Sequence, residues 1–315
     1  MRAVAVASYI ALPLALIALA SVALSPVTWA ALWLVISLAG CGTTPAVWAK
    51  LVSLRFDAAR GLALGLMLVG TGSAALLAPM LLGPIFVEQG WRTAVYVMAA
   101  VTFLVGMPVS LLVRQSATPR AATAPGGKGR FERNRTTIVL LVVAALLGLI
   151  VAGLIIHLVP MLIDRGIDAS EAARMAAAVG FAVLVARVVV GYLFDRFHAP
   201  YVASLFLISP IVTCLLLMTG GPMVLAALLL GLAAGAEVDM LAYFTSRYAR
   251  IENYGATYGA ILGVFSLGAA CGPLLFGWSV DVTGSYDLIL AVSAAFLLLV
   301  VGLVATLGPY RSDED

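Results

Sequence analysis

The sequence predicts an all-α membrane protein that crosses the bilayer about ten times and consists of two similar helical bundles. Three observations predict this fold class. Hydrophobic residues make up 63% and charged residues 10% of the 315 residues, against about 45–50% and about 25% in soluble domains. The hydrophobic residues gather in long stretches, and part of the chain repeats itself.

Each hydrophobic stretch is close to the ~20 residues that a helix needs to cross a bilayer. Only helices and closed barrels satisfy their backbone groups in lipid, and these stretches are too long for barrel strands. The first begins with Met-Arg, as a signal peptide can, but its apolar run is longer than the h-region of such a peptide, so we expect it to span as well. The predicted helices cover residues 3–24, 28–53, 61–87, 91–113, 137–163, 171–194, 201–219, 222–246, 255–280 and 286–308.

The repeat appears when the chain is displaced by 194 residues. Four glycines of window 61–90 then coincide with glycines of window 255–284, where chance gives about 1.4 coincidences. The matching pairs are Gly61 and Gly255, Gly65 and Gly259, Gly83 and Gly277, Gly90 and Gly284, together with Pro79 and Pro273. Residues 137–194 have no counterpart, because Met1 falls opposite Asp195. We therefore expect a first bundle of four helices (1–113), a linker (114–136) and a second bundle of six (137–315).

Basic residues set the expected orientation. One set of loops and termini holds thirteen Lys and Arg residues and the opposite set holds three. Because cytoplasmic loops carry the excess of positive charge, both termini and the linker are expected on the cytoplasmic side of the cell membrane. The linker is rich in Pro, Gly and Ala and predicts a flexible connector. Its Gly-Gly-Lys128-Gly stretch does not continue into a phosphate loop.

Nothing in the sequence indicates catalysis. The three cysteines lie inside predicted helices at scattered spacings, and the chain has two histidines. We expect no enzyme activity, cofactor, metal site or nucleic-acid partner. The expected surroundings are the lipid bilayer and a small-molecule solute, with a proton as a candidate coupled ion.

A short motif ends the sixth predicted helix. Gly191-Tyr-Leu-Phe-Asp195-Arg196 places an acid and a base in a tight cytoplasmic loop. An Asp beside a neighbouring helix N-terminus can stabilise one closed conformation, although a purely structural loop is the alternative. The stretch matches the G-x-L-x-D-R motif and resembles the major facilitator superfamily, but Phe197 and His198 replace the basic residues that follow in that family.

Further residues resemble the monocarboxylate transporter and oxalate–formate antiporter branch. They include Arg60-Gly-Leu-Ala-Leu-Gly65, Gly90-Trp91-Arg92 and Asp281-Val-Thr-Gly284. The resemblance covers essentially the whole chain and implies a two-bundle transporter fold, in which the ten helices correspond to helices 3 to 12 of twelve.

Arg187 is the strongest candidate for a functional residue. A charge near the middle of the membrane costs about 2.5–3.5 kcal/mol, and a guanidinium there can hold a carboxylate through two hydrogen bonds. The resemblance implies a carboxylate-binding arginine at this position. In the mammalian-type relatives an Asp precedes it by one turn, whereas this chain has Val183. A permanent salt bridge is the alternative.

Glu237 and Asp239 are the candidate partners of Arg187. Two residues are about 200° apart on a helix, so at most one carboxyl should face the cavity squarely. Asp239 shares a face with Gly231 and Gly235, which predicts close helix packing, and Glu237 is therefore the preferred cavity residue. Either acid could balance Arg187 or carry a proton.

Two further residues are weaker candidates for solute binding. His157 can relay a proton near neutral pH, but a single His near a helix end also suits a structural hydrogen bond. Tyr258 is a possible lining residue. The sequence thus predicts a secondary active transporter of a small organic anion, such as a monocarboxylate, by alternating access. The alternatives are a facilitator of drugs or other solutes, and a non-transporting remnant that needs a partner.

Overall fold

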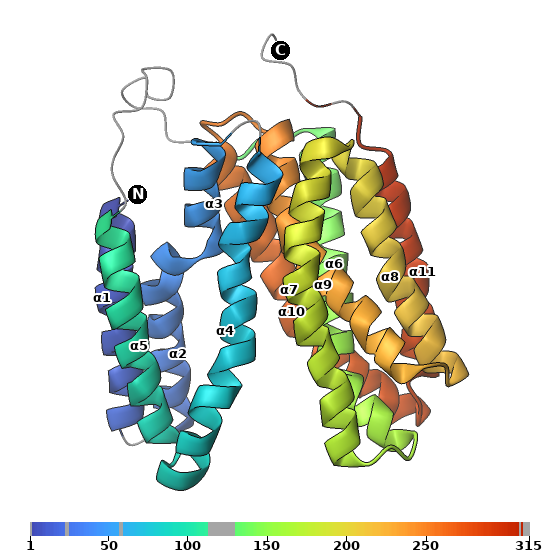
Figure 1. The fold of residues 1–315 in the computed structure, drawn as a ribbon, viewed down its shortest axis with the longest axis horizontal. Helices are drawn as coiled ribbons and strands as arrows, with labels where there is room; N and C mark the ends of the chain where they lie inside the picture. The colour runs from blue at the N-terminus through green and yellow to red at the C-terminus, as the bar shows by residue number, and fades with distance from the viewer. Residues whose placement is uncertain (1, 23–24, 57–58, 113–129, 309, 311–315) are drawn as a thin grey trace. The chain divides into compact units, whose positions relative to one another are not determined.

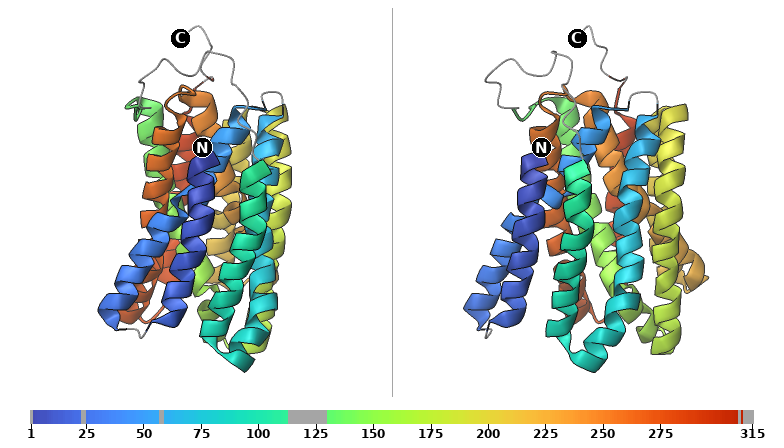
Figure 2. Two further views of the ribbon diagram at one scale, coloured as in Figure 1. Left: turned by 90° about the vertical axis from the view of Figure 1, so that its left-hand side faces the viewer. Right: turned by 60° about the vertical axis from the view of Figure 1, so that its left-hand side comes forward.

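The computed structural model describes residues 2–22, 25–56, 59–112, 130–308 and 310, and in these residues it consists of helices joined by short connections (Figures 1 and 2). Among the described residues, nine helical segments are long and apolar enough to cross a membrane. These segments correspond to nine of the ten predicted spans. The tenth, 61–87, is also helical and forms α4, but it is not among these nine segments. The chain is therefore an all-α, multi-pass membrane protein. Most of the predicted linker lies outside the described residues.

The chain divides into two compact units. Unit 1 comprises residues 1–51 and 74–126, and unit 2 comprises 52–73 and 127–315. Residues 52–73 thus group with the second half of the chain, although the sequence places them in the first copy. The physical reason is close backbone packing between the start of α4 (Arg60–Gln89) and α7 (Ala169–Arg196), as described below.

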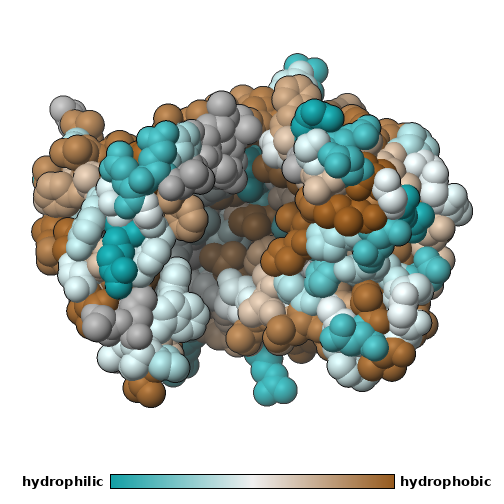
Figure 3. All heavy atoms as spheres, turned by 90° about the horizontal axis from the view of Figure 1, so that it is seen from below, coloured by the Kyte–Doolittle hydropathy of each residue, from teal (hydrophilic) through white to brown (hydrophobic). Residues whose placement is uncertain are grey.

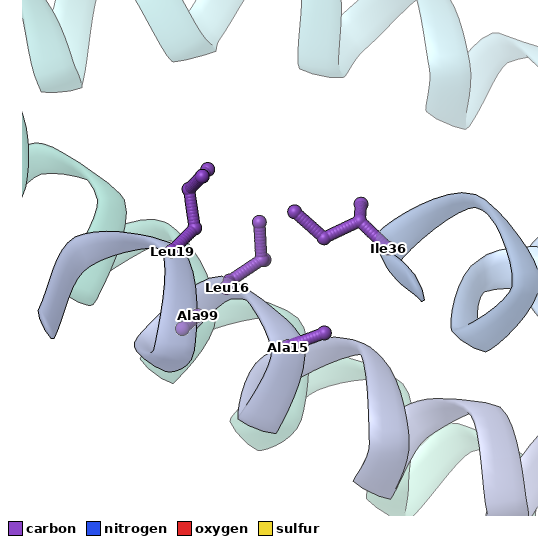
Figure 4. Close-up of a cluster of buried hydrophobic side chains, with 5 residues drawn as sticks. All are labelled: Ala15, Leu16, Leu19, Ile36 and Ala99. Carbon is purple, nitrogen blue, oxygen red and sulfur yellow. The ribbon is translucent and has the colours of Figure 1, made fainter. Parts of the chain in front are cut away.

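Unit 1 is built from α1 (Arg2–Ser21), α2 (Pro26–Ala39), α3 (Pro45–Ser53, assigned to this unit as far as residue 51), the second half of α4, and α5 (Trp91–Leu112). Helices α1 and α5 pack together extensively. A small core, shown in Figure 4, consists of Ala15, Leu16 and Leu19 of α1, Ala99 of α5 and Ile36 of α2.

The predicted span 28–53 is not one continuous helix. Helix α2 ends at Ala39, a short 3-10 turn covers Gly40–Thr43, and α3 begins at Pro45. Thr44 is extended, with φ −67° and ψ 152°, because the ring of a following proline disfavours helical backbone. The Gly and Pro residues of this stretch therefore interrupt the helix inside the membrane span.

Unit 2 contains the start of α4 and six long helices. The six are α6 (Arg135–Asp164), α7, α8 (Ala199–Thr219), α9 (Met223–Tyr248), α10 (Tyr254–Thr283) and α11 (Asp287–Ala305). The main packing partners are α6 with α10, α7 with α9, and α8 with α11. A space-filling view from below shows hydrophilic and hydrophobic residues interspersed on this face, with hydrophobic ones at many places along the outer edge (Figure 3).

Glycines bring the paired helices of unit 2 into backbone contact. A Cβ at Gly272 of α10 would collide with the carbonyl oxygen of Leu149 in α6, and one at Gly148 with that of Phe265. Without a hydrophobic force between helices in lipid, such close van der Waals packing drives their association. The same device brings α7 against α9 and so positions the candidate site.

Candidate functional site

Arg187 and Asp239 form a buried ion pair between α7 and α9. The Nη1 of Arg187 donates to Oδ1 of Asp239 over 2.7 Å. The two residues are 8% and 2% exposed. A buried pair of this kind is favourable only with good geometry and further hydrogen bonds, because both charges have left water. The structure thus joins two of the residues that the sequence singles out.

The glycine face of α9 sets the position of this pair. A Cβ at Gly235 would lie 2.6 Å from the Cβ of Ala186, and one at Gly231 would meet Val179 of α7. These glycines and Asp239 share a face of α9, so the packing that presses α9 against α7 also directs Asp239 toward Arg187. The expectation that Asp239 contacts a neighbouring helix agrees with this geometry.

Glu237 and Tyr258 complete a polar cluster around the pair. Glu237 is 7% exposed and Tyr258, on α10, is fully buried. Glu237 interacts electrostatically with Arg187 and Asp239, as does the hydroxyl of Tyr258. We call Arg187, Glu237, Asp239 and Tyr258 the polar cluster.

The polar cluster holds buried groups that lack hydrogen-bond partners. These groups are Nε of Arg187, Oδ2 of Asp239, Oε2 of Glu237 and the hydroxyl of Tyr258. They are four of the five buried side-chain atoms of this kind in the described residues. Because more than about 90% of buried polar groups in proteins are paired, four orphans in one cluster indicate a place for a polar ligand or water. The donors and acceptors present suit a carboxylate and a proton.

His157 lies in a different hydrogen-bonded environment. Its Nε2 is 3.0 Å from the carbonyl oxygen of Pro273 and its Nδ1 is 2.9 Å from the hydroxyl of Tyr286. A carbonyl only accepts, so in neutral His157 Nε2 carries the proton and Nδ1 accepts from Tyr286. Burial raises the pKa of Tyr286, which keeps its hydroxyl protonated. No described contact joins His157 to the polar cluster.

The carboxylate of Asp195 caps the start of α4. Its two oxygens accept hydrogen bonds from the backbone N–H groups of Gly61 and Leu62, over 2.7 and 2.8 Å. These N–H groups belong to the first turn of α4, where they have no partner within the helix and the helix dipole favours a negative charge. Asp195 therefore joins the end of α7 to the N-terminus of α4.

Glycine makes this approach possible. A Cβ at Gly191 would lie 2.5 Å from the carbonyl oxygen of Gly61, and one at Gly65 would collide with the carbonyl oxygen of Arg187. The backbones of α4 and α7 thus touch from the capping contact up to the level of the ion pair. Arg196 is exposed and lies over the ring of Tyr192 at 5.1 Å.

A network behind Asp195 was not anticipated from the sequence. The hydroxyl of Tyr243 donates to the carbonyl oxygen of Phe194 over 2.9 Å and accepts from Nε of Arg247 over 3.2 Å. The only sequence signal is the spacing of Tyr243 and Arg247, which puts them one helical turn apart. Their connection to Phe194 depends on tertiary packing.

Comparison with known proteins identifies the family. The family description "Major Facilitator Superfamily" matches residues 2–273 and also 139–314. The chain belongs to the major facilitator superfamily. This is a superfamily of membrane transporters and not of enzymes.

Individual relatives agree with this assignment. Human monocarboxylate transporter 11 is 27% identical over 265 residues, which are 78% of this chain and 56% of that protein. Monocarboxylate transporter 13 of Bos taurus is 28% identical over 269 residues, with 81% and 62% covered. The chain thus spans less than two thirds of the length of these relatives. The superfamily transporter FucP in its outward conformation has a TM-score of 0.75 at 13% identity, over 97% of this chain and 83% of FucP.

Proposed function

We propose that this chain acts in the secondary active transport of a small organic anion, with Arg187 as the group that binds its carboxylate. The observation that carries the proposal is the polar cluster, in which a buried guanidinium and two buried carboxyl groups retain unpaired atoms. The monocarboxylate transporters among the relatives support the same class of solute.

The ion pair suggests how binding and charge balance are linked. Nη1 of Arg187 is engaged by Asp239, whereas Nε is without a partner and can donate to an incoming carboxylate. An anion would then compete with Asp239 for the guanidinium. A proton on Asp239 would remove that competition, because a neutral carboxyl is far less costly to leave unpaired than a carboxylate. A proton on Glu237 would remove a second negative charge that interacts with Arg187. Uptake of the anion together with a proton would keep the cluster near neutrality.

The Asp195 contact would serve the conformational part of the cycle. It holds the N-terminus of α4 to the end of α7, and the glycine packing continues from there to Arg187. Alternating access requires such contacts to break and re-form as helices move past each other. In this proposal the termini lie in the cytoplasm, as the distribution of basic residues predicts.

The test is uptake of labelled lactate, pyruvate and formate into proteoliposomes. Arg187→Ala should reduce uptake by about 100-fold, equivalent to loss of about 2.7 kcal/mol of binding to a charged group. The matched control is Arg174→Ala, because Arg174 lies on the same helix but is exposed. Its uptake should stay within about twofold of the wild type.

The opposite results would reject the proposal. Normal monocarboxylate uptake by a folded Arg187→Ala protein would remove Arg187 as the anion site. Uptake of a cation or neutral solute that is insensitive to competing monocarboxylates would favour a facilitator of another solute class. Folding of each variant is checked by its elution from a size-exclusion column in detergent.

A further inference from the structure

Helix α8 begins without a cap of its own. Its N-cap residue, His198, makes no side-chain hydrogen bond to the first turn. Instead, the backbone N–H of Ala199 donates to the hydroxyl of Tyr310 over 2.7 Å, from a residue 111 positions later in the chain. Ala199 is fully buried, so this N–H has little access to water and needs a protein partner. Tyr310 supplies it.

Tyr310 follows the last helix, as do Leu307 and Gly308, and these three residues contact other parts of unit 2. Leu307 is only 7% exposed. The carbonyl oxygen of Gly308 accepts a hydrogen bond of 2.6 Å from the hydroxyl of Tyr248 in α9. We call Leu307, Gly308 and Tyr310 the C-terminal strap. It is fixed at two points, on α9 through Tyr248 and on α8 through Tyr310.

The ring of Tyr310 is packed among side chains of α9 and of the turn before α8. Ring centroids lie 5.0 Å apart for His198 and 5.6 Å apart for Tyr248. The guanidinium carbon of Arg247 is 5.5 Å from the Tyr310 ring and 5.3 Å from that of Tyr243. Arg247 is therefore close to both tyrosine rings, at distances that favour a cation–π attraction.

These contacts hold the backbone on both sides of Asp195 in the sequence. On the preceding residue, the carbonyl oxygen of Phe194 accepts a hydrogen bond from Tyr243, whose hydroxyl in turn accepts from Arg247. After Asp195, Tyr310 holds the N–H of Ala199. Asp195 lies between these two fixed points and presents its carboxylate to α4. A carboxylate that accepts two backbone hydrogen bonds needs its own backbone held in place, since misplacement by an ångström would break both.

We propose that Tyr310 is a positioning residue for Asp195, and that the C-terminal strap stabilises the conformation in which Asp195 caps α4. The inference rests on the proposed function to the extent that this capping contact belongs to the transport cycle. Releasing the strap would shift the population toward conformations without the contact, because only the capped conformation gains from an ordered Asp195 turn.

Burial is consistent with this role. It raises the pKa of Tyr310 above its ordinary value, so the hydroxyl remains neutral near physiological pH. Its oxygen can then accept from Ala199 without introducing a negative charge at the aromatic cluster. The contribution comes from hydrogen bonding and ring packing, and the two can be separated by substitution.

The test is hydrogen–deuterium exchange of the full chain in detergent, followed at the amides of Gly61, Leu62 and Ala199. Tyr310→Phe keeps the ring but removes the hydroxyl, and should speed exchange about fivefold at all three amides, as for loss of a helix cap. Tyr310→Ala should speed it further. Asp195→Asn is the positive control for Gly61 and Leu62. Tyr201→Phe is the matched negative control, because Tyr201 also packs on His198 but its hydroxyl makes no described hydrogen bond.

A result confined to α8 would overturn the inference. If Tyr310→Phe and Tyr310→Ala speed exchange at Ala199 but leave Gly61 and Leu62 as protected as in the wild type, the strap caps α8 and does not position Asp195. Uptake kinetics give a second criterion, since Tyr310→Phe should change the maximal rate and leave KM unchanged. Exchange needs no solute, so an absence of anion uptake would reject the proposed function and leave the exchange result standing.

Discussion

Helix α9 and its counterpart in the first half of the chain fold very differently. In the register of the repeat, α9 corresponds to the stretch occupied by α2, the 3-10 turn and α3. Within the most hydrophobic window of each, 61% of the residues of α9 are buried, against 12% of those in Pro26–Ser53. One copy is a continuous helix inside unit 2, and the other is an interrupted helix on the surface of unit 1.

The residues at matching positions explain the difference. Glu237 and Asp239 of α9 match Thr43 and Pro45, so the carboxyl groups of one copy stand where the other has a turn and a helix start. Gly235, which lets α9 touch α7, matches Cys41, which is exposed. In this register the charge and the close packing are found in the second half of the chain, and the first half has an interrupted helix in their place.

Helix α2, in the more exposed of the two copies, also borders an apolar pocket. The pocket has a volume of about 700 Å³, and unit 1 alone lines it. Its walls include Trp29 and Trp33 of α2, which are 51% and 44% exposed. The position that matches Trp33 in α9 is Ala227, which is fully buried. A large side chain is thus accommodated in the first copy because the described helices of unit 1 leave space beside it.

The largest expected difference between the copies is at the ion pair. Asp239→Ala leaves the buried guanidinium of Arg187 without its hydrogen-bonded ion-pair partner and should lower the free energy of unfolding by about 3–5 kcal/mol. Thr43→Ala, at the position that matches Glu237, removes a hydroxyl bonded to the carbonyl oxygen of Gly40 within its own turn and should cost less than about 1 kcal/mol. Thermal unfolding in detergent measures both.

A double substitution sharpens this prediction. Arg187→Met with Asp239→Leu removes both charges and should recover most of the stability that Asp239→Ala loses, because a buried ion pair and an apolar pair are often of similar stability. Anion uptake should not recover. Recovery of uptake in the double variant would show that the pair is structural and that the solute binds elsewhere.

A smaller difference between the copies is expected at Gly235, the glycine that lets α9 pack closely against α7. In Gly235→Ala the new Cβ would lie 2.6 Å from Ala186 and 2.7 Å from the carbonyl oxygen of Val183, so α7 and α9 must separate. We expect a loss of about 1–3 kcal/mol. Cys41→Ala, at the matching exposed position, should stay within about 0.5 kcal/mol. Equal melting temperatures for the two variants would contradict the packing argument.

Much of the helical frame was predictable from hydrophobic length alone. The spans expected at 137–163, 171–194 and 222–246 are α6, α7 and α9, with ends shifted by a few residues. The break between α2 and α3 was not predicted, although Gly40, Gly42 and Pro45 lie in it. Hydropathy was continuous there, and the local backbone preference decided the structure.

The candidate site was predictable by residue and not by arrangement. Charged residues are rare in lipid, which singles out Arg187, Glu237 and Asp239. The spacing of the two acids on α9 does not tell which of them faces Arg187. Packing of the glycine face against α7 fixes that rotation, and it selects Asp239 for the ion pair. The cap that Tyr310 gives to α8 joins residues 111 positions apart, and no local pattern in the sequence indicates it.

The smallest expected difference is at the starts of the two helices, and here α2 of the first copy is expected to be more sensitive to substitution than α9. Helix α2 has a capping box, in which Oγ of Ser25 accepts from the N–H of Thr28 and Oγ1 of Thr28 accepts from the N–H of Ser25. The N-cap of α9, Pro222, makes no side-chain hydrogen bond. Because α2 is little buried, its first turn depends on this cap, whereas tertiary packing holds α9.

Ser25→Ala should therefore lower the free energy of opening the first turn of α2 by about 0.5–1 kcal/mol. Amide exchange there should become about two- to fivefold faster. Pro222→Ala should leave exchange at the start of α9 unchanged, since no side-chain cap is lost. Exchange measured on both variants in detergent compares the two ends directly. If α2 is unaffected by Ser25→Ala, then contacts other than the cap hold its start, and α2 is less dependent on local structure than its exposure indicates.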